Sequence, residues 1–156
     1  MTVNDRGTRP WLIKVRDGLE SSTRIAIGPG GQQVIFGSAG EDWLIGGRAL
    51  DRMFGAANDD WLFGGRDRDR MFGGGGSDRL FGGPGGDWLY GSGGNDRLVG
   101  GPGFDVLHGG NGADRFVSRQ PDSSVDTVRR FSGIQGDKIV LHKDGFGISN
   151  LDELVF

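Results

Sequence analysis

Several residue types are scarce in this chain of 156 residues, and each absence removes a class of function. Cysteine is absent and His108 and His142 are the two histidines, so a zinc or copper site built on soft ligands is not expected. The chain contains neither a His-Glu-x-x-His nor a Gly-x-Ser-x-Gly segment. We therefore expect no enzyme activity and interpret the two histidines as surface or packing residues.

Long apolar runs are missing as well. No run is long enough for a transmembrane helix. Residues 1–9 are polar and the apolar run at 11–15 is too short for the core of a signal peptide, so no N-terminal secretion signal is visible. Glycine, in contrast, is abundant with 33 residues, which in a chain of one-domain length is typical of a repeat protein.

The glycines follow a nine-residue period. Nine consecutive nonapeptides occupy residues 37–117 without an insertion, each with glycine at position 1, aspartate at position 6 and an apolar residue at position 8. Residues 28–36 form a tenth, degenerate repeat with Gln33 in place of aspartate, which we expect to cap the array. The aspartate column consists of Asp42, Asp51, Asp60, Asp69, Asp78, Asp87, Asp96, Asp105 and Asp114.

The residue types of this repeat favour calcium. Glycine lets the backbone adopt positive φ and expose its carbonyls, while aspartate supplies a hard anionic oxygen. Magnesium would not need so many protein oxygens. We predict that the nine aspartates bind Ca²⁺, with Asp126 as a further candidate. The predicted carbonyl ligands lie around Gly74, Gly76, Gly83, Gly85, Gly94, Gly101, Gly103, Gly110 and Gly112.

Positions 7 to 9 of each repeat are predicted to form a short strand. Alternation points position 8 inward and positions 7 and 9 outward, so two nonapeptides make one 18-residue coil of an all-β, right-handed parallel β-roll, a solenoid. Aspartates 18 residues apart then stack on one edge at ~4.8 Å. Four gaps between stacked turns lie on one edge and three on the other, which predicts about seven interior calcium sites at most.

The core of such a roll is small, because each nonapeptide supplies one inward apolar side chain. Stacked ionised aspartates also repel by roughly 1 kcal/mol, even at the dielectric constant of water. We therefore expect a chain that is disordered without calcium and folds on binding it, at the ~0.1 to 1 mM typical of extracellular modules. Because Ala49, Asn58 and Asp67 replace glycine at position 4, we expect residues 73–114 to hold calcium more fully than 37–69.

The repeat Gly-Gly-x-Gly-x-Asp-x-U-x, with U apolar, is that of the RTX, or hemolysin-type, calcium-binding proteins, and the chain is identified as a member of that group. Val-Asp-Thr-Val-Arg-Arg-Phe at 125–131 and Gly-Asp-Lys-Ile-Val-Leu at 136–141 follow. With them, residues 28–156 resemble the C-terminal β-roll of serralysin-type proteases and the R-modules of mannuronan C5-epimerases. Arg130, where the family usually has an acid, and His142, where it usually has serine, depart from the pattern.

Three parts are expected along the chain. Residues 1–27 form an N-terminal cap whose short apolar runs suit strands covering the first coil. Residues 28–117 form the calcium-binding roll. The resemblance implies that residues 118–156 hold a C-terminal cap and a type I secretion signal, and therefore that type I secretion machinery exports the protein to the extracellular space. We expect no nucleic-acid partner, because a secreted protein rarely meets one and lysine is scarce.

The outward position 7 of one sheet suggests a ligand face. Rings interleaved with arginines suit an anionic polysaccharide, through stacking and bidentate carboxylate bonds. Strand propensity and coverage by the flanking segments explain the same residues. Three functions stay open: calcium-driven folding alone, an accessory polysaccharide-binding module of an extracellular enzyme or adhesin, and a protein-interaction or self-assembling module. The residues of this face are Trp43, Trp61, Arg79, Arg97 and Arg115.

Overall fold

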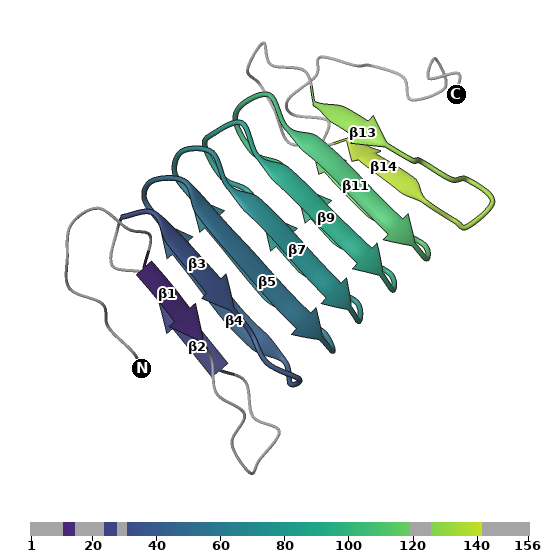
Figure 1. The fold of residues 1–156 in the computed structure, drawn as a ribbon. Helices are drawn as coiled ribbons and strands as arrows, with labels where there is room; N and C mark the ends of the chain where they lie inside the picture. The colour runs from purple at the N-terminus through teal and green to yellow at the C-terminus, as the bar shows by residue number, and fades with distance from the viewer. Residues whose placement is uncertain (1–10, 15–23, 28–30, 119–125, 142–156) are drawn as a thin grey trace.

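The computed structural model describes residues 11–14, 24–27, 31–118 and 126–141. All the elements in these ranges are β-strands, and they form two seven-stranded parallel sheets (Figure 1). Odd-numbered strands make one sheet and even-numbered strands make the other. No helix long and apolar enough to cross a membrane occurs in these ranges. The chain therefore winds as a β-roll with one strand in each sheet per coil, which confirms the fold predicted from the period.

Within each sheet, neighbouring strands are separated in the chain by one strand of the other sheet. The odd sheet contains β1 Trp11–Lys14, β3 Gln33–Phe36, β5 Asp51–Ala57, β7 Arg70–Gly75, β9 Trp88–Gly93, β11 Val106–Asn111 and β13 Thr127–Arg129. The even sheet contains β2 Arg24–Ile27, β4 Asp42–Gly47, β6 Trp61–Gly65, β8 Arg79–Phe81, β10 Arg97–Val99, β12 Arg115–Ser118 and β14 Lys138–Leu141.

Several of these strands are longer than the three residues expected. β4, for example, continues through the first two glycines of the next repeat, because Gly47 pairs with Gly65 one coil further on. The backbone ladder thus extends into the start of each turn. The turns are held in register by the same pairing as the strands.

Coil spacing is 18 residues within the repeats and longer at the C-terminal end. Leu44 pairs with Leu62, but Val106 pairs with Thr127, 21 residues on. The strands β1 and β2 at one end and β13 and β14 at the other pair in parallel with their neighbours. The flanking segments therefore continue the two sheets with their own strands.

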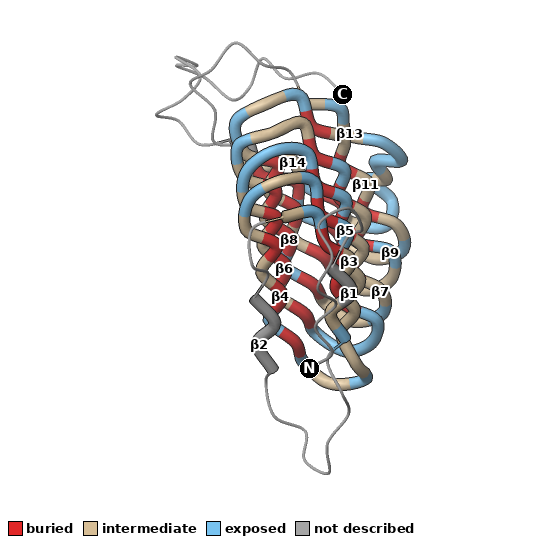
Figure 2. Tube along the Cα trace, turned by 60° about the vertical axis from the view of Figure 1, so that its left-hand side comes forward, coloured by how far each residue is buried: buried red, intermediate tan, exposed pale blue. Residues whose placement is uncertain are grey.

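A single file of side chains fills the space between the sheets. These residues come from position 8 of successive repeats, and Figure 2 shows buried residues lining the inside of the coils while exposed ones lie on the turns. Each fully buried side chain contributes about 1.5 to 3 kcal/mol. Ile13, Val128 and Ile139 pack against the file from the flanking strands. The file consists of Ile35, Leu44, Met53, Leu62, Met71, Leu80, Leu89, Leu98, Leu107 and Phe116.

Aromatic rings stack along the outer faces at the strand separation. Phe54 lies 5.0 Å from Phe72, and Phe72 lies 4.9 Å from Tyr90, with nearly parallel ring planes. The even sheet has a similar pair in Phe63 and Phe81 at 5.0 Å. Each pair contributes about 0.5 to 1.5 kcal/mol beyond the area it buries, so the position-9 columns stabilise the stacking of coils from outside.

Candidate metal centre

The first six residues of each repeat form the turn between the sheets, and the turn depends on positive φ. Gly74 and Gly76, at positions 2 and 4, have φ of 117° and 129°. Ala49, Asn58 and Asp67 adopt the same region with φ of 75°, 69° and 71°. The degenerate turns therefore share the backbone conformation of the glycine-rich ones. The requirement at position 2 was not foreseen from the sequence.

The predicted carbonyl ligands divide between these two positions. Gly74, Gly83, Gly101 and Gly110 are at position 2, and Gly76, Gly85, Gly94, Gly103 and Gly112 are at position 4. All of them except Gly85 have positive φ.

Every aspartate of the column is buried, and one carboxylate oxygen of eight of them accepts a backbone N–H from the preceding coil. The Asp42 N–H donates to Oδ1 of Asp60 at 2.8 Å. The same bond recurs throughout Asp51 to Asp114 at 2.8 to 2.9 Å. Because the donor belongs to the neighbouring coil, stacking fixes the direction of each carboxylate.

The other carboxylate oxygen is buried without a hydrogen-bond partner among the residues described. It is Oδ2 in the eight aspartates from Asp51 to Asp114. Asp42 differs: its Oδ2 accepts bonds from N and Oγ of Ser38, and its Oδ1 has no partner. A buried anionic oxygen without a donor is costly unless a cation or a proton neutralises it.

The glycine at position 1 lets a second oxygen come close to this one, because it has no Cβ to keep the two apart. A Cβ on Gly82 would lie 2.3 Å from Oδ2 of Asp87 and 2.4 Å from the carbonyl oxygen of Gly100 in the next coil. A carboxylate oxygen and a carbonyl oxygen thus face one small space. The same pair of neighbours occurs at Gly37, Gly46, Gly55, Gly64, Gly73, Gly82 and Gly91. These spaces coincide with the four and three gaps counted from the sequence.

At the N-terminal end of one edge, a hydrogen-bond donor occupies the aspartate position. Gln33 is 1% exposed, and its Nε2 donates to the carbonyl oxygen of Gly46 at 3.1 Å. In the interior the corresponding carbonyls face a carboxylate oxygen. An amide N–H therefore meets this carbonyl where an interior gap would need a cation.

Two aspartates beyond the repeats extend the columns. Oδ1 of Asp126 accepts the N–H of Asp105 at 3.2 Å, so this predicted candidate lies on the odd edge. On the even edge, Asp137 accepts the N–H of Asp114 on Oδ1 at 2.9 Å and that of Ser132 on Oδ2 at 2.7 Å. Two N–H donors thus satisfy Asp137. It was missed because 23 residues separate it from Asp114, although the Gly-Asp-Lys-Ile segment around it follows the repeat pattern.

Burial perturbs the titration of these carboxylates. In the absence of a cation, it raises the pKa of Asp69 to about 8 and the pKa of Asp60 and Asp96 to about 7. The hydrogen bond from the preceding coil lowers each pKa in part, and the charges of neighbouring aspartates raise it further. The column therefore favours a bound proton or a bound cation over free carboxylates.

The donor set fits Ca²⁺. Among the described residues, no three side chains of His, Cys, Asp or Glu converge on one point. This follows from the architecture, because each coil brings one buried carboxylate to an edge and backbone carbonyls would supply the other oxygens. A site of many hard oxygens with flexible geometry is what Ca²⁺ prefers, whereas zinc and copper favour nitrogen and sulfur ligands.

The predicted ligand face is one column of the even sheet, but its rings are engaged with their neighbours. Trp43 stacks on Trp61 at 5.0 Å, and the Arg79 guanidinium lies 4.6 Å from the Trp61 ring centroid. Arg97 and Arg115 continue the column by register. Since a sugar ring stacks on an open aromatic face, this arrangement does not favour the polysaccharide alternative.

Comparison with known proteins agrees with the geometry of the turns. The family model of the RTX calcium-binding nonapeptide repeat, which describes four copies of the repeat, matches residues 28–60, 54–89 and 90–119. The match spans more than half of the chain and includes the degenerate repeat at 28–36. No curated protein and no solved structure matches the chain. Repeat, parallel roll and oxygen-lined turns lead to the same conclusion: the chain belongs to the family of RTX calcium-binding nonapeptide-repeat proteins.

Proposed function

We propose that this chain is a secreted module that folds when calcium binds, with the column aspartates and the carbonyls of the turns as ligands. The observation that carries the proposal is the row of buried carboxylate oxygens without donors, most of them close to a carbonyl oxygen of the adjacent coil beside a position-1 glycine. Bound calcium supplies the positive charge that these oxygens need. Because the two oxygens come from adjacent coils, binding joins one coil to the next.

The number of sites follows from the spaces beside the position-1 glycines. Seven of these spaces have a carboxylate oxygen and a carbonyl oxygen beside them. At Gly37 the carboxylate oxygen, Oδ2 of Asp42, already accepts two hydrogen bonds from Ser38. In the other six spaces the carboxylate oxygen has no hydrogen-bond partner among the described residues. Ala49, Asn58 and Asp67 hold positive φ at a cost of about 1 to 2 kcal/mol each, so the ranking of 73–114 above 37–69 stays a prediction.

Native mass spectrometry at saturating calcium tests the proposal directly. We expect about seven bound ions, and as free calcium falls the ions of residues 37–69 should be released before those of residues 73–114. Magnesium at the same concentration should leave the sites empty, because it demands short octahedral distances and retains its waters. Binding of one or two ions only would contradict a role for stacked turns throughout the array.

The pH dependence should have opposite signs with and without calcium. In chelator, the folded pKa of Asp60 and Asp69 lies above the ordinary 3.8, so the metal-free fold binds more protons than the unfolded chain. Its stability is then greatest below about pH 4 and is lost as pH rises towards 8. Calcium needs the ionised carboxylates, so calcium-supported stability should rise over the same window.

Circular dichroism at pH 5, 6 and 7 checks this reversal. In chelator, acidification from pH 7 to 5 should increase the β signal. In calcium, the same change should raise the calcium concentration at the folding midpoint. A pH dependence of one sign under both conditions would show that the buried aspartates are not the groups that bind calcium.

The location of the module follows from the same coupling. Extracellular calcium lies in the range that such modules bind, and cytoplasmic calcium lies far below it. The proposed domain division assigns 1–27 and 118–156 to the caps and export through type I secretion machinery to the C-terminal part, whose residues 142–156 lie outside the described ranges. The chain would then remain unfolded until it reaches the outside of the cell.

A further inference from the structure

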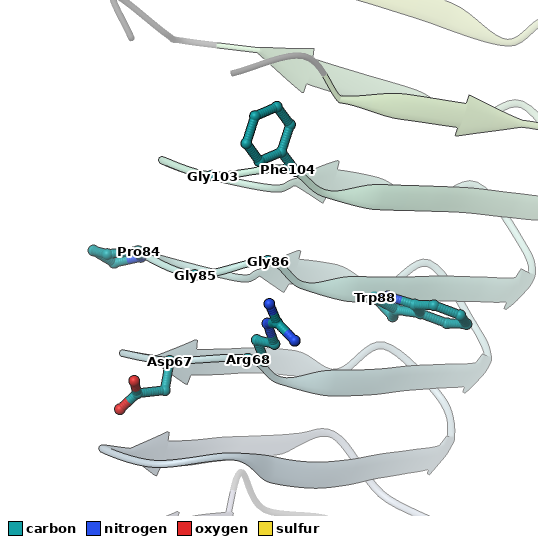
Figure 3. A pocket seen from close by; sticks show the side chains of 8 residues that line it. All are labelled: Asp67, Arg68, Pro84, Gly85, Gly86, Trp88, Gly103 and Phe104. Carbon is teal, nitrogen blue, oxygen red and sulfur yellow. The ribbon is translucent and has the colours of Figure 1, made fainter. Parts of the chain in front are cut away.

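A pocket of about 510 Å³ lies on the edge of the roll where the turns lead into the odd sheet (Figure 3). It spans three consecutive turns of this edge, those before β7, β9 and β11. Its walls combine two aromatic rings, one guanidinium and bare backbone. The lining residues are Asp67, Arg68, Pro84, Gly85, Gly86, Trp88, Gly103 and Phe104.

The pocket exists because one side chain is missing from a column. Position 5 on this edge is occupied by Leu50, Arg68, Gly86 and Phe104, and Gly86 is the one glycine at position 5 among the nine repeats. Its φ is not in the positive region, and apart from its chain neighbours the nearest described atom to a Cβ there would be the Phe104 carbonyl oxygen, at 3.3 Å. The backbone conformation therefore does not require glycine, and a side chain needs a shift of only a few tenths of an ångström. Gly86 opens a slot between Arg68 and Phe104, about two strand separations, or ~9.6 Å, apart.

The walls of this slot suit an apolar group with negative charge beside it. Phe104 is 71% exposed and Trp88 is 41% exposed, and the Arg68 side chain extends towards Gly86 (Figure 3). Arg70 lies 5.2 Å from the Trp88 ring centroid and adds positive charge. Asp67 and Arg68 are the only polar side chains in the lining, so the slot offers few partners for the hydroxyls of a sugar.

The charge around the slot is one-sided. Three exposed arginines lie on the two turns before β5 and β7, on the same edge, and two more follow at the start of these strands. Asp67 is the exposed acid of the two turns. The five turns of the opposite edge contain no lysine or arginine, although Arg79, Arg97 and Arg115 begin three of the strands that follow them. This concentration exceeds what a single carboxylate would need. The five are Arg48, Arg52, Arg66, Arg68 and Arg70.

We propose that this edge binds an acidic peptide segment, which inserts a phenylalanine-like side chain into the slot at Gly86 and pairs its carboxylates with the five arginines. Tryptophan and arginine dominate the binding energy of protein interfaces, and the volume lies in the range of sites for small groups. The inference goes beyond calcium binding but rests on it, because three stacked turns form the slot. Binding should weaken as salt rises, since the arginines are exposed.

The test uses the whole chain in saturating calcium, with its β-rich circular dichroism confirmed first. The probe is the N-acetylated, fluorescently labelled peptide Asp-Glu-Phe-Glu-Asp, and binding is followed by anisotropy. Gly86→Leu fills the slot and should weaken binding at least about tenfold. Ser77→Leu makes the comparable addition at position 5 on the opposite edge and should change nothing. Both variants should keep the calcium midpoint of the wild type.

A second pair of variants tests the charge. Arg68→Gln should weaken binding about tenfold, whereas Arg115→Gln, on the even sheet, should have no effect. Unchanged binding by Gly86→Leu, or equal binding of a peptide with alanine in place of phenylalanine, would overturn the slot as the binding site. Tighter binding of alginate or poly(dT) than of the peptide would overturn the choice of partner. If the folded, calcium-loaded chain binds no peptide, this inference alone is wrong. If the chain stays disordered in calcium, the proposed function is wrong as well.

Discussion

Removal of calcium should convert the chain from a β-rich fold into a disordered one. The core is one side chain wide, so the apolar burial that supports each coil is a single residue from each of two repeats. Two costs oppose this burial. Many glycines have to be ordered, and glycine loses the most conformational freedom on folding. The carboxylates on both edges have to be buried. Without a cation these carboxylates have either to bind protons or to remain charged at the cost of burial.

The transition should be cooperative and large. Each interior space has one oxygen from one coil and one from the next, so loss of one ion weakens the two coils that it joins. By the scaling of compact and unfolded chains, the radius of gyration should rise from about 15 Å towards about 41 Å. Far-ultraviolet circular dichroism and small-angle scattering in a chelator titration measure both changes.

Magnesium provides the control for this experiment. Added after chelation at the concentration at which calcium restores the fold, it should leave the chain disordered. The calcium-coupled folding proposal fails if the spectrum and the radius in excess chelator already match those in calcium.

Gly82→Ala should weaken calcium binding strongly. The new Cβ would enter the space between Oδ2 of Asp87 and the carbonyl of Gly100, at 2.3 and 2.4 Å. It would displace both proposed ligands at once. Overpacking of this kind costs about 1 to 3 kcal/mol, so the calcium midpoint should rise about tenfold or more. The φ of Gly82 is not positive, so the effect would come from the lost space and not from backbone strain.

Gly75→Ala is the matched control. Gly75 also lacks positive φ, and a Cβ there would meet nothing within 4 Å. This variant should keep the calcium midpoint, or lower it slightly through the reduced entropy of the unfolded chain. Calcium-titrated circular dichroism of the two variants decides the matter, and equal midpoints would show that the spaces beside the position-1 glycines do not hold the ion.

Much of the roll could be predicted because one register rule repeats along the chain. Once position 8 points inward and a coil takes 18 residues, the rule places Leu62 beside Leu44 and Asp78 beside Asp60, and the structure has both in place. The number of gaps on each edge follows from the same rule. Because residues 18 apart in the sequence become neighbours in adjacent coils, their contacts can be predicted without the tertiary structure.

Features outside the period depended on the tertiary structure. The 23-residue step from Asp114 to Asp137 follows no repeat, and only the pairing of β12 with β14 brings the two together. The left-handed conformation of Ala56 at position 2 was equally hidden, because alanine by itself favours other conformations. Here the stacking of neighbouring turns outweighs the local preference of the residue.

The sequence by itself determined the family, the parallel roll, the inward file and the two columns of aspartates, because each of these depends only on residue type and period. The tertiary structure decided which carboxylate oxygens lack donors, how Gln33 and Asp137 end the columns, and that the rings of Trp43 and Trp61 face each other. It also placed the slot at Gly86 between Arg68 and Phe104. These features depend on contacts between coils, whose distances and directions exist only when the turns are stacked.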